Sequence, residues 1–470
     1  MSHRPAAPPV PTPIPAPLPI PAQGIAGRYA RRLLEDLGVS TRAAPAPPPP
    51  APALAWARCG AMALTGLPGQ TPRVPDGALA ACADGVGLAW TALGLRPPGR
   101  GNDGAEGASV LLGERAALLG LGRAGSEAPG RSCRLLRAAD GWVALNLART
   151  DDRDALPAWL ETPGGTSDAW AFARRGVATQ SRATLAERAG WLGLPFAVAS
   201  DPTVPEVWCR REPFGPRGAP PRRPPLVLDF TALWAGPLVG SGLADVGARV
   251  VKIESVGRPD GARGGDRRFF DLLNAGKASV AVDTTDPGDQ ALLGALFDAA
   301  DVVLESTRPR ALAQWGLDSE HFLTARPGRV WLSLTGYGRS DPSPGRVAFG
   351  DDAGVAAGCS DAVAGSGDPV FCGDAIADPL AGLHATLAVW AAWRTGGGER
   401  LDVSLAGVAR HALRFAPTGP YHLGGSGEAL RVHAGEDETP VAAPRARAPR
   451  GRARPLGADT TTWRRELRTC

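Results

Sequence analysis

The sequence predicts an α/β fold: a doubly wound, mostly parallel sheet together with a smaller α/β domain. Between residues 226 and 334, short runs rich in Val, Ile, Leu and Phe alternate with segments of helical pattern. Such alternation is typical of parallel sheets, whose strands are joined by helices. The chain has 470 residues, of which 44% are hydrophobic, enough for the core that such a sheet needs.

Five runs are predicted to be strands because β-branched and large apolar residues dominate them. They are LVLDF (226–230), RVVKIE (249–254), ASVAVD (278–283), DVVLE (301–305) and RVWLSL (329–334). A helix is predicted over 286–300, which opens with Asp-Pro. No GxGxxG follows the first strand and no GxxxxGK[ST] occurs, so the sheet is Rossmann-like without the motifs that favour NAD, FAD or ATP.

Composition divides the chain into five parts. Residues 1–54 are rich in Pro and Ala and are predicted to be largely disordered. A Pro/Arg-rich segment, 212–225, is predicted to link two folded regions, 55–211 and 226–415. Residues 416–470 are predicted to be a partly packed tail.

Charge and cysteine content argue against several function classes. The net charge is only +4 and both signs are interspersed, which does not favour nucleic acid as a partner. The seven cysteines are scattered without a CxxC, so neither a metal site nor a disulfide framework is predicted. We find no run of 18 apolar residues and no signal-peptide pattern, and therefore expect a cytoplasmic protein without a membrane span.

The segment from Gly373 to Glu399 places Asp378 directly before Pro379 and a helical run of small and apolar residues. Asp is a favoured N-cap and Pro fits the first helical position, so Asp378 is predicted to cap this helix. A carboxylate at the start of a helix can also act as a nucleophile. The local pattern alone leaves both interpretations open.

Six motifs between 228 and 405 occur in the order found in the family III CoA-transferases, which the chain resembles. They are LDFTALWAGP (228–237), LADVGARVVKIE (243–254), NAGKASVAVD (274–283), DVVLESTRPR (301–310), TGYG (335–338) and RTGGGERLDVSL (394–405). Each motif alone is weak, but six in order are specific. The resemblance implies a transferase that moves coenzyme A between an acyl-CoA and a carboxylic acid.

The resemblance also implies a nucleophilic aspartate. In this family it lies in a D-x-x-x-G-[LM]-H segment, which Asp378 to His384 fits position for position. Counting back without gaps from Thr395 by the family's spacing reaches Asp374 instead, one helical turn earlier. Asp378 is therefore our candidate and Asp374 its rival.

In the implied mechanism the aspartate forms a mixed anhydride and then an aspartyl-CoA thioester, with no metal and no permanently bound cofactor. For binding of coenzyme A, the resemblance points to the turn at Ala235, and charge and position suggest Lys252 and Arg258. The implied partners are an acyl-CoA, a carboxylic acid and a second copy of the chain in a homodimer.

Other interpretations stay open. The same aspartate could serve an acyl-CoA isomerase or intramolecular CoA-transferase, and a catalytically weak binding or partner subunit is also consistent. The racemase branch of the family pairs its Asp with a His, whereas here no histidine lies between His321 and His384. Asp351 and Asp352 stand in that region, either as a second acid or, as we expect, as turn-capping or solvated residues.

Upstream of the linker, three fragments resemble later parts of the same family. They are CGAMALTG (59–66), AADGWVALNLA (138–148) and ERAGWLGLPFAV (187–198). Residues 55–211 are thus interpreted as a degenerate second half and small domain placed ahead of the first half. Near the end, ARPLGADT (453–460) resembles the family's closing segment, which predicts that part of the tail packs.

Overall fold

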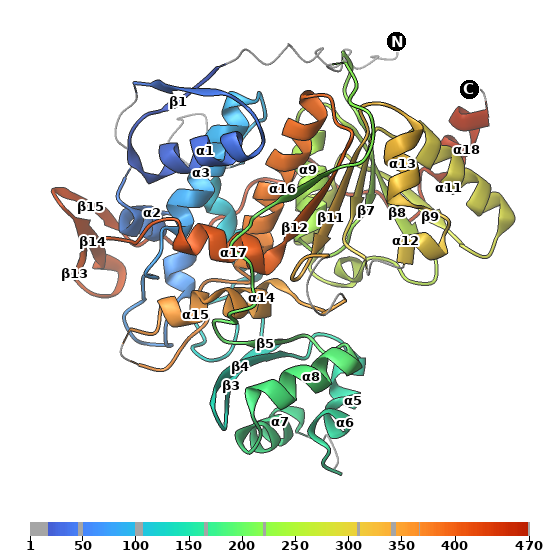
Figure 1. Ribbon diagram of the computed structural model, residues 1–470. Coiled ribbons are helices and arrows are strands. Elements are labelled where there is room, and N and C mark those ends of the chain that lie inside the picture. The colour runs from blue at the N-terminus through green and yellow to red at the C-terminus, as the bar shows by residue number, and fades with distance from the viewer. Residues whose placement is uncertain are drawn as a thin grey trace.

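The computed structural model describes residues 17–45, 50–98, 107–163, 168–219, 222–307, 311–339, 345–365 and 367–468. At its centre is a seven-stranded sheet in the order β6-β12-β11-β10-β7-β8-β9 (Figure 1). Its strands are β6 (Arg210–Pro213), β7 (Leu226–Phe230), β8 (Arg249–Ser255), β9 (Ala278–Val282), β10 (Val302–Glu305), β11 (Val330–Thr335) and β12 (Glu399–Ser404). Strands β7 to β12 pair in parallel, and β6 is antiparallel to β12. The predicted mostly parallel α/β sheet is confirmed.

The five predicted strands agree with β7 to β11 to within one residue at either end. The predicted helix over 286–300 is α11 (Pro287–Ala299), whose N-cap Asp286 accepts the backbone N–H of Asp289 at 2.8 Å. These elements could be predicted because buried parallel strands are continuous apolar runs and because Asp-Pro marks a helix start.

Helices cover both faces of the sheet, because alternate strand residues point to opposite sides. Val227, Leu304 and Leu332 belong to one core cluster, and Leu228, Val303 and Trp331 to another. The first face packs against α9 (Ala235–Ala244) and α16 (Ala377–Arg394), with α10 (Arg267–Asn274) beside α9. The second face packs against α11, α13 (Ser319–Ala325) and α18 (Thr460–Arg468), and α12 (Ala311–Gln314) follows β10.

A small domain hangs below this body (Figure 1). It consists of an antiparallel sheet of β3 (Cys133–Ala138), β4 (Gly141–Asn146) and β5 (Phe196–Val198), with α5 (Thr150–Asp154), α6 (Leu156–Leu160), α7 (Ala169–Ala178) and α8 (Arg182–Leu192). Trp159, fully buried, centres its separate core. Strands β4 and β5 contact α14 (Gly350–Ala357), which joins the small domain to the main body.

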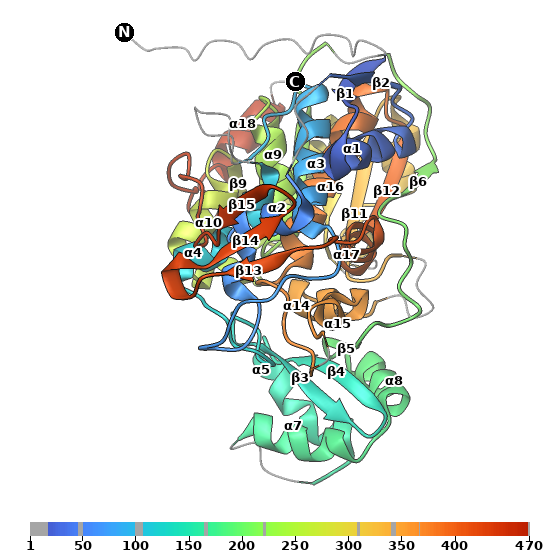
Figure 2. The same cartoon turned by 90° about the vertical axis from the view of Figure 1, so that its left-hand side faces the viewer.

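The N-terminal region corrects one expectation. Where composition predicted disorder, the described residues 17–45 form β1 (Leu18–Pro21), α1 (Gly24–Asp36) and β2 (Thr41–Ala44), and residues 1–16 and 46–49 lie outside the described residues. The reason is an amphipathic face: Tyr29, Leu33 and Leu34 of α1 are fully buried against α3. The region continues with α2 (Pro52–Arg58), α3 (Leu79–Ala92) and α4 (Glu114–Leu119), and α3 packs on α16 (Figure 2).

The Pro/Arg-rich segment predicted as a linker begins inside the sheet. Its first two residues, Glu212 and Pro213, end the edge strand β6. Cross-strand ion pairs hold that strand: Arg211 Nε lies 2.8 Å from Glu399 Oε2, and Arg400 pairs with Glu212. Pairing with β12 therefore orders the start of a segment whose composition suggested extended chain.

The C-terminal region is packed over much of its length. Strands β13 (His422–Gly424), β14 (Arg431–Ala434) and β15 (Asp437–Pro440) form a small sheet, of which β14 and β15 lie against α2 (Figure 2). In α18, Trp463 is buried in the second core cluster. The remaining elements are α15 (Cys359–Ala362), α17 (Leu405–Arg414) and four short 3-10 helices (Ala61–Leu64, Ala108–Leu112, Gly261–Gly264 and Gly427–Ala429).

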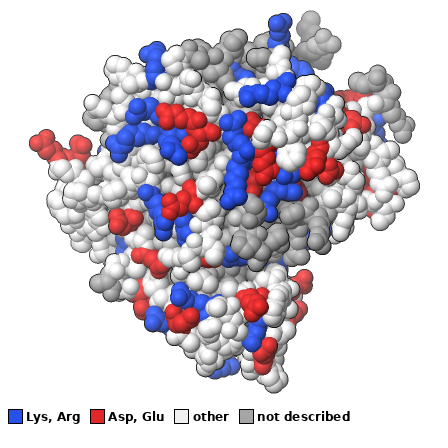
Figure 3. Space-filling view, in the orientation of Figure 1, with Lys and Arg blue, Asp and Glu red and all other residues white. Residues whose placement is uncertain are grey.

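On the face shown in Figure 3, Lys and Arg side chains are interspersed with Asp and Glu rather than gathered into a block of one sign. Of the helices in the described part of the chain, none combines the length and the apolar character that crossing a bilayer requires.

Candidate active site

Three helices begin where Asp378 lies. Asp378 is the second residue of α16, Ala235 is the first of α9 directly after β7, and Gly350 is the first of α14. The start of α9 marks the carboxyl edge of the sheet, where parallel α/β sheets bind their ligands. Helix N-termini carry unpaired N–H groups and a partial positive charge, so their meeting favours a negatively charged side chain.

The helix of Asp378 starts two residues earlier than predicted. Asp378 was expected to be the N-cap, but α16 begins at Ala377. The four-residue turn before it has Gly373 at φ 69° and Ala375 at φ 42°. A non-glycine residue with positive φ is strained, and such strain gathers at functional sites. This turn fixes where the helix begins and therefore where Asp378 lies.

Backbone N–H groups from the two neighbouring helices bind Asp378. Gly350 N–H donates to Asp378 Oδ2 at 3.1 Å, and Ala235 N–H is a second donor. A Cβ at position 350 would lie 2.3 Å from Oδ2, so only glycine allows this approach. The Asp378 side chain remains partly exposed.

Burial raises the pKa of Asp378 to about 6, while the charge of Arg115 and the two N–H groups act in the opposite direction. Asp378 is therefore mainly ionised at neutral pH and is only weakly solvated. A carboxylate in this state is a competent nucleophile.

Asp374, the rival candidate, has different surroundings. Its side chain is fully buried, and Arg115 from α4 grips both of its oxygens, with 2.8 Å between Arg115 Nε and Asp374 Oδ2. This bidentate arrangement is the strong form of an ion pair. The carboxylate of Asp374 is thus occupied, whereas Asp378 forms no ion pair within the part of the chain that the structure describes.

Asp351 and Asp352 lie in the first turn of α14, beside the same site. Asp351 accepts the N–H of Ala375 at 2.9 Å, and burial together with the charge of Asp374 raises the pKa of Asp351 to about 7. Asp352 accepts the N–H of Phe349 at 3.0 Å and the Nδ2 of Asn146 at 3.1 Å. The expected capping role is thus seen at Asp352. Solvation is not, since both side chains are buried.

Arg115 lies between Asp374 and an aromatic ring. Its guanidinium carbon is 5.0 Å from the centroid of the Trp234 ring, and Trp234 stands edge-on to Phe269 at 5.1 Å. Trp234 occupies the turn between β7 and α9. Stacking on Trp234 and the fork to Asp374 hold the Arg115 side chain in one orientation.

His384, the last residue of the motif, is buried two turns along α16. Its Nδ1 lies 2.7 Å from the backbone oxygen of Leu380, and its Nε2 lies 2.8 Å from the hydroxyl of Tyr29. Nδ1 must donate to the carbonyl, so Nε2 accepts from Tyr29. Burial lowers the pKa of His384 to about 3, and the ring is neutral.

The three residues predicted to bind coenzyme A lie in different environments. Ala235 is at the start of α9, where its N–H meets Asp378. Lys252 is 1% exposed, and its ammonium donates to Thr231 O at 2.8 Å and pairs with Asp260 at 2.9 Å. Arg258 is exposed in the turn after β8. The fold thus places Ala235 beside Asp378. The contacts of Lys252 with Thr231 and Asp260 instead hold the turn after β7 in place.

The NAGK segment (274–277) has a structural role. Lys277 is buried and its ammonium donates to Asp229 Oδ2 at 2.7 Å, Pro237 O at 2.8 Å and Asn274 Oδ1 at 3.1 Å. These bonds tie the end of β7 to the first turn of α9. They fix the helix start that points at Asp378.

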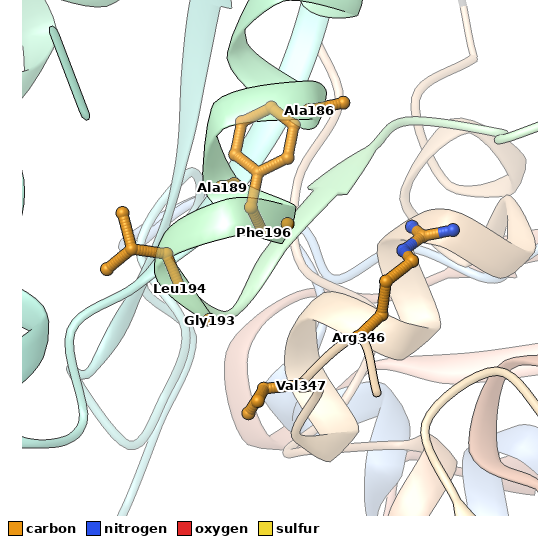
Figure 4. A pocket seen from close by; sticks show the side chains of 8 residues that line it. Ala186, Ala189, Gly193, Leu194, Phe196, Arg346 and Val347 are labelled. Atoms are coloured by element: carbon orange, nitrogen blue, oxygen red, sulfur yellow. The ribbon is translucent and has the colours of Figure 1, made fainter. Parts of the chain in front are cut away.

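A small, partly open pocket of about 20 Å³ lies between the small domain and the segment that leads into α14 (Figure 4). Ala189, Leu194 and Phe196 line it from the small domain, and Arg346 and Val347 line it from the segment before α14. Arg346 pairs with Asp201 at 3.3 Å. The pocket is lined by residues just upstream of Gly350, but not by Asp378 itself.

The fold and site define an α/β protein with a half-buried carboxylate set among helix N-termini. Residues 225–445 match the model of CoA-transferase family III, and this part of the chain belongs to that family. The family resemblance expected from the six motifs is confirmed.

Relatives and solved structures cover only part of the chain. The Succinyl-CoA–D-citramalate CoA-transferase of Chloroflexus aurantiacus is 34% identical over 192 residues, 38% of this chain and 48% of the relative. The Succinate–glutarate CoA-transferase of Agrobacterium fabrum is 31% identical over 227 residues, 41% of this chain and 54% of the relative. A crystal structure of a hypothetical protein from Mycobacterium tuberculosis is 34% identical, covers 39% of this chain and 54% of its own, and has a TM-score of 0.36. The chain thus spans about half the length of these curated relatives.

Arg115 is the site residue that sequence reasoning missed. It lies 259 residues from Asp374 along the chain and outside the matched residues. Its surroundings in sequence, Glu-Arg-Ala-Ala, are those of an ordinary exposed helix. A tertiary contact of this kind leaves no local signal, so no sequence pattern could have found it.

Proposed function

We propose that this protein transfers coenzyme A from an acyl-CoA to a carboxylic acid through a thioester on Asp378. The observation that carries the proposal is the partly exposed Asp378 carboxylate, which forms no ion pair with any described residue and is bound by N–H groups of Gly350 and Ala235. Membership of residues 225–445 in CoA-transferase family III supports it, as do the activities named for the relatives.

The chemistry needs one carboxylate. Asp378 attacks the thioester carbonyl of the donor and expels the CoA thiolate, leaving a mixed anhydride. The thiolate then attacks the aspartyl carbonyl, so that the donor acid leaves and an aspartyl-CoA thioester forms. The acceptor carboxylate repeats the two steps in reverse, which releases the new acyl-CoA and restores Asp378. Each step exchanges one acyl bond for another, so the acyl group stays activated and the overall exchange of one thioester for another is nearly balanced, as in other covalent catalysis.

The N–H groups of Gly350 and Ala235 supply the electrostatic part. They bind the Asp378 carboxylate in the resting site and remain beside the carboxyl group when the aspartyl carbonyl is attacked and its oxygen becomes negatively charged. Negative charge on that oxygen in the tetrahedral intermediates is then stabilised by donors already in place, which is the property of an oxyanion hole.

Binding of coenzyme A is proposed to use the turn at Ala235 and the exposed Arg258, which a phosphate could reach. Lys252 was predicted as a phosphate ligand, but its buried contacts to Thr231 and Asp260 favour a role in holding that turn. An Arg258→Ala variant would weaken CoA binding, measured by titration calorimetry. Unchanged binding in that variant would remove Arg258 from the proposal.

We further propose that residues 55–211 replace the part of the relatives that the match does not cover, because Arg115 and Asn146 from this region reach the site. A homodimer also belongs to the proposal. Light scattering coupled to size-exclusion chromatography tests it, and a mass of one chain at micromolar concentration would exclude it.

The test of the nucleophile uses succinyl-CoA first, then acetyl-CoA and formyl-CoA, with glutarate, citramalate and oxalate as acceptors. These probes follow the names of the relatives. Intact-mass analysis of the wild-type protein is expected to show a CoA adduct that hydroxylamine removes. Asp378→Asn should lose the adduct and Asp374→Asn should keep it. The reverse pattern would move the nucleophile to Asp374, and no adduct with any donor would reject the proposed activity.

A further inference from the structure

We propose that Arg115, which lies outside the family-matched residues, is a positioning residue of the Asp378 site: it sequesters Asp374 and sets a positive charge beside the nucleophile. This inference rests on the function proposed above. It assigns to the N-terminal region a direct part in the chemistry.

The geometry of Arg115 leaves it little freedom. Its side chain is 24% exposed, and its Nε and Nη2 face the two oxygens of a fully buried Asp374. The backbone at Gly130 closes the pair from the side, since a Cβ there would lie 2.9 Å from Arg115 Nη2 and 3.9 Å from Asp374 Oδ1. Trp234 covers the guanidinium plane. The pair is therefore built into the fold.

Charge is the reason that such a pair matters here. Two carboxyl groups interact with Asp378: Asp351 from α14 and Asp374 from the turn before α16, while α9 presents backbone and Asp352 follows Asp351 on α14. Neighbouring carboxylates disfavour each other's ionisation, because like charges repel. Arg115 is the cation that acts on Asp378 among the described residues, and it offsets their repulsion.

Arg115 also decides which aspartate can react. By occupying both oxygens of Asp374, it withdraws that carboxylate from any substrate. Lysine could supply the charge but not the two parallel N–H groups. The pairing thus directs reaction to Asp378, one turn along the chain.

The test compares the pH dependence of adduct formation in four variants. In Arg115→Ala the midpoint should move upward by about one pH unit or more, the shift typical of losing an adjacent opposite charge. In Asp374→Asn the midpoint should move downward, because a like charge is lost and Arg115 keeps its own. In the double variant the two shifts should largely cancel. Arg115→Lys should restore most of the midpoint but not the full rate.

A matched control is the ion pair of Glu114, which precedes Arg115 on α4. Arg447 grips the buried Glu114, the neighbour of Arg115, with 2.7 Å between Arg447 Nε and Glu114 Oε1. Arg447→Ala breaks an equivalent buried pair without removing charge at Asp378, so its midpoint should equal that of the wild type. If Arg115→Ala behaves like Arg447→Ala, Arg115 is merely structural and the proposal is wrong.

Failure of the proposed activity can be told apart. If the wild type forms no adduct, the infrared band of the protonated Asp378 carboxyl, identified by subtraction of Asp378→Asn, still reports its titration. That band should persist to higher pH in Arg115→Ala and disappear at lower pH in Asp374→Asn. Equal titration in all three proteins would overturn the inference without reference to turnover.

Discussion

The surroundings of Asp374 and of Asp378 differ although the two residues are one helical turn apart. Asp374 is fully buried and ion-paired, while Asp378 is partly exposed and accepts backbone N–H groups. The first environment is that of a structural carboxylate and the second that of a reactive one. The difference teaches that residue type and spacing do not fix a role here, since the role depends on what the rest of the chain brings to each side chain.

The largest effect is expected from filling the space beside Asp378. In Gly350→Ala the new Cβ would meet Asp378 Oδ2 at 2.3 Å and Ala375 O at 2.5 Å. The helix start must shift, which removes one N–H donor from the nucleophile. We expect a loss of adduct formation of about 100-fold, the usual cost of one oxyanion-hole donor. Rapid-quench mass analysis measures it.

Gly294→Ala in α11 is the matched control, because a Cβ there has nothing within 4 Å. It should leave the rate unchanged and stabilise the fold by up to about 1 kcal/mol through helix propensity. If Gly350→Ala formed the adduct at the rate of this control, the close approach of α14 to Asp378 would make no contribution to catalysis.

The substitution that matters less for adduct formation, Asp374→Asn, should cost more stability than Asp378→Asn. Asp374→Asn leaves the Arg115 guanidinium without its partner, and breaking a buried pair on one side costs about 3 kcal/mol. Asp378→Asn breaks no ion pair and should cost less than about 1 kcal/mol. Urea unfolding followed by circular dichroism measures both. Equal losses would contradict the division into a structural and a reactive carboxylate.

The pH dependence sharpens the same division. The attacking species is the Asp378 carboxylate, and its pKa is about 6. The rate of adduct formation should therefore fall about tenfold per pH unit below that value and level off above it. Stopped-flow measurement between pH 5 and pH 8 decides the matter, and a rate that is flat across this range would mean that ionisation of Asp378 does not limit attack.

The surroundings of Asp378 could be predicted from the sequence better than those of Asp374. The carboxyl edge of the sheet followed from the apolar run at 226–230 and the Asp-Pro start at 378–379, both local patterns. The ion pair of Asp374 could not be predicted in this way, because its partner Arg115 lies 259 residues away in the sequence. The order in α1 was likewise missed, since the apolar face of Tyr29 and Leu33 becomes informative only when α3 is there to cover it. Local periodicity encodes elements, whereas charge pairing between distant segments depends on the completed fold.

The smallest effect is expected at His384, which shares the motif with Asp378 but not its chemistry. Tyr29→Phe removes the hydroxyl that donates to His384 Nε2 at 2.8 Å and leaves that nitrogen buried without a donor. The expected loss of stability is about 1–2 kcal/mol, the cost of an unsatisfied buried acceptor. Because the pKa of His384 is about 3, its ring stays neutral over the whole range in which Asp378 titrates. The pH profile of adduct formation should thus be that of the wild type. Tyr421→Phe, at an exposed tyrosine, controls for loss of a hydroxyl and should be neutral in both measurements. A shifted profile in Tyr29→Phe alone would instead bring His384 into the reaction and make the Gly-Leu-His segment more than a packing motif.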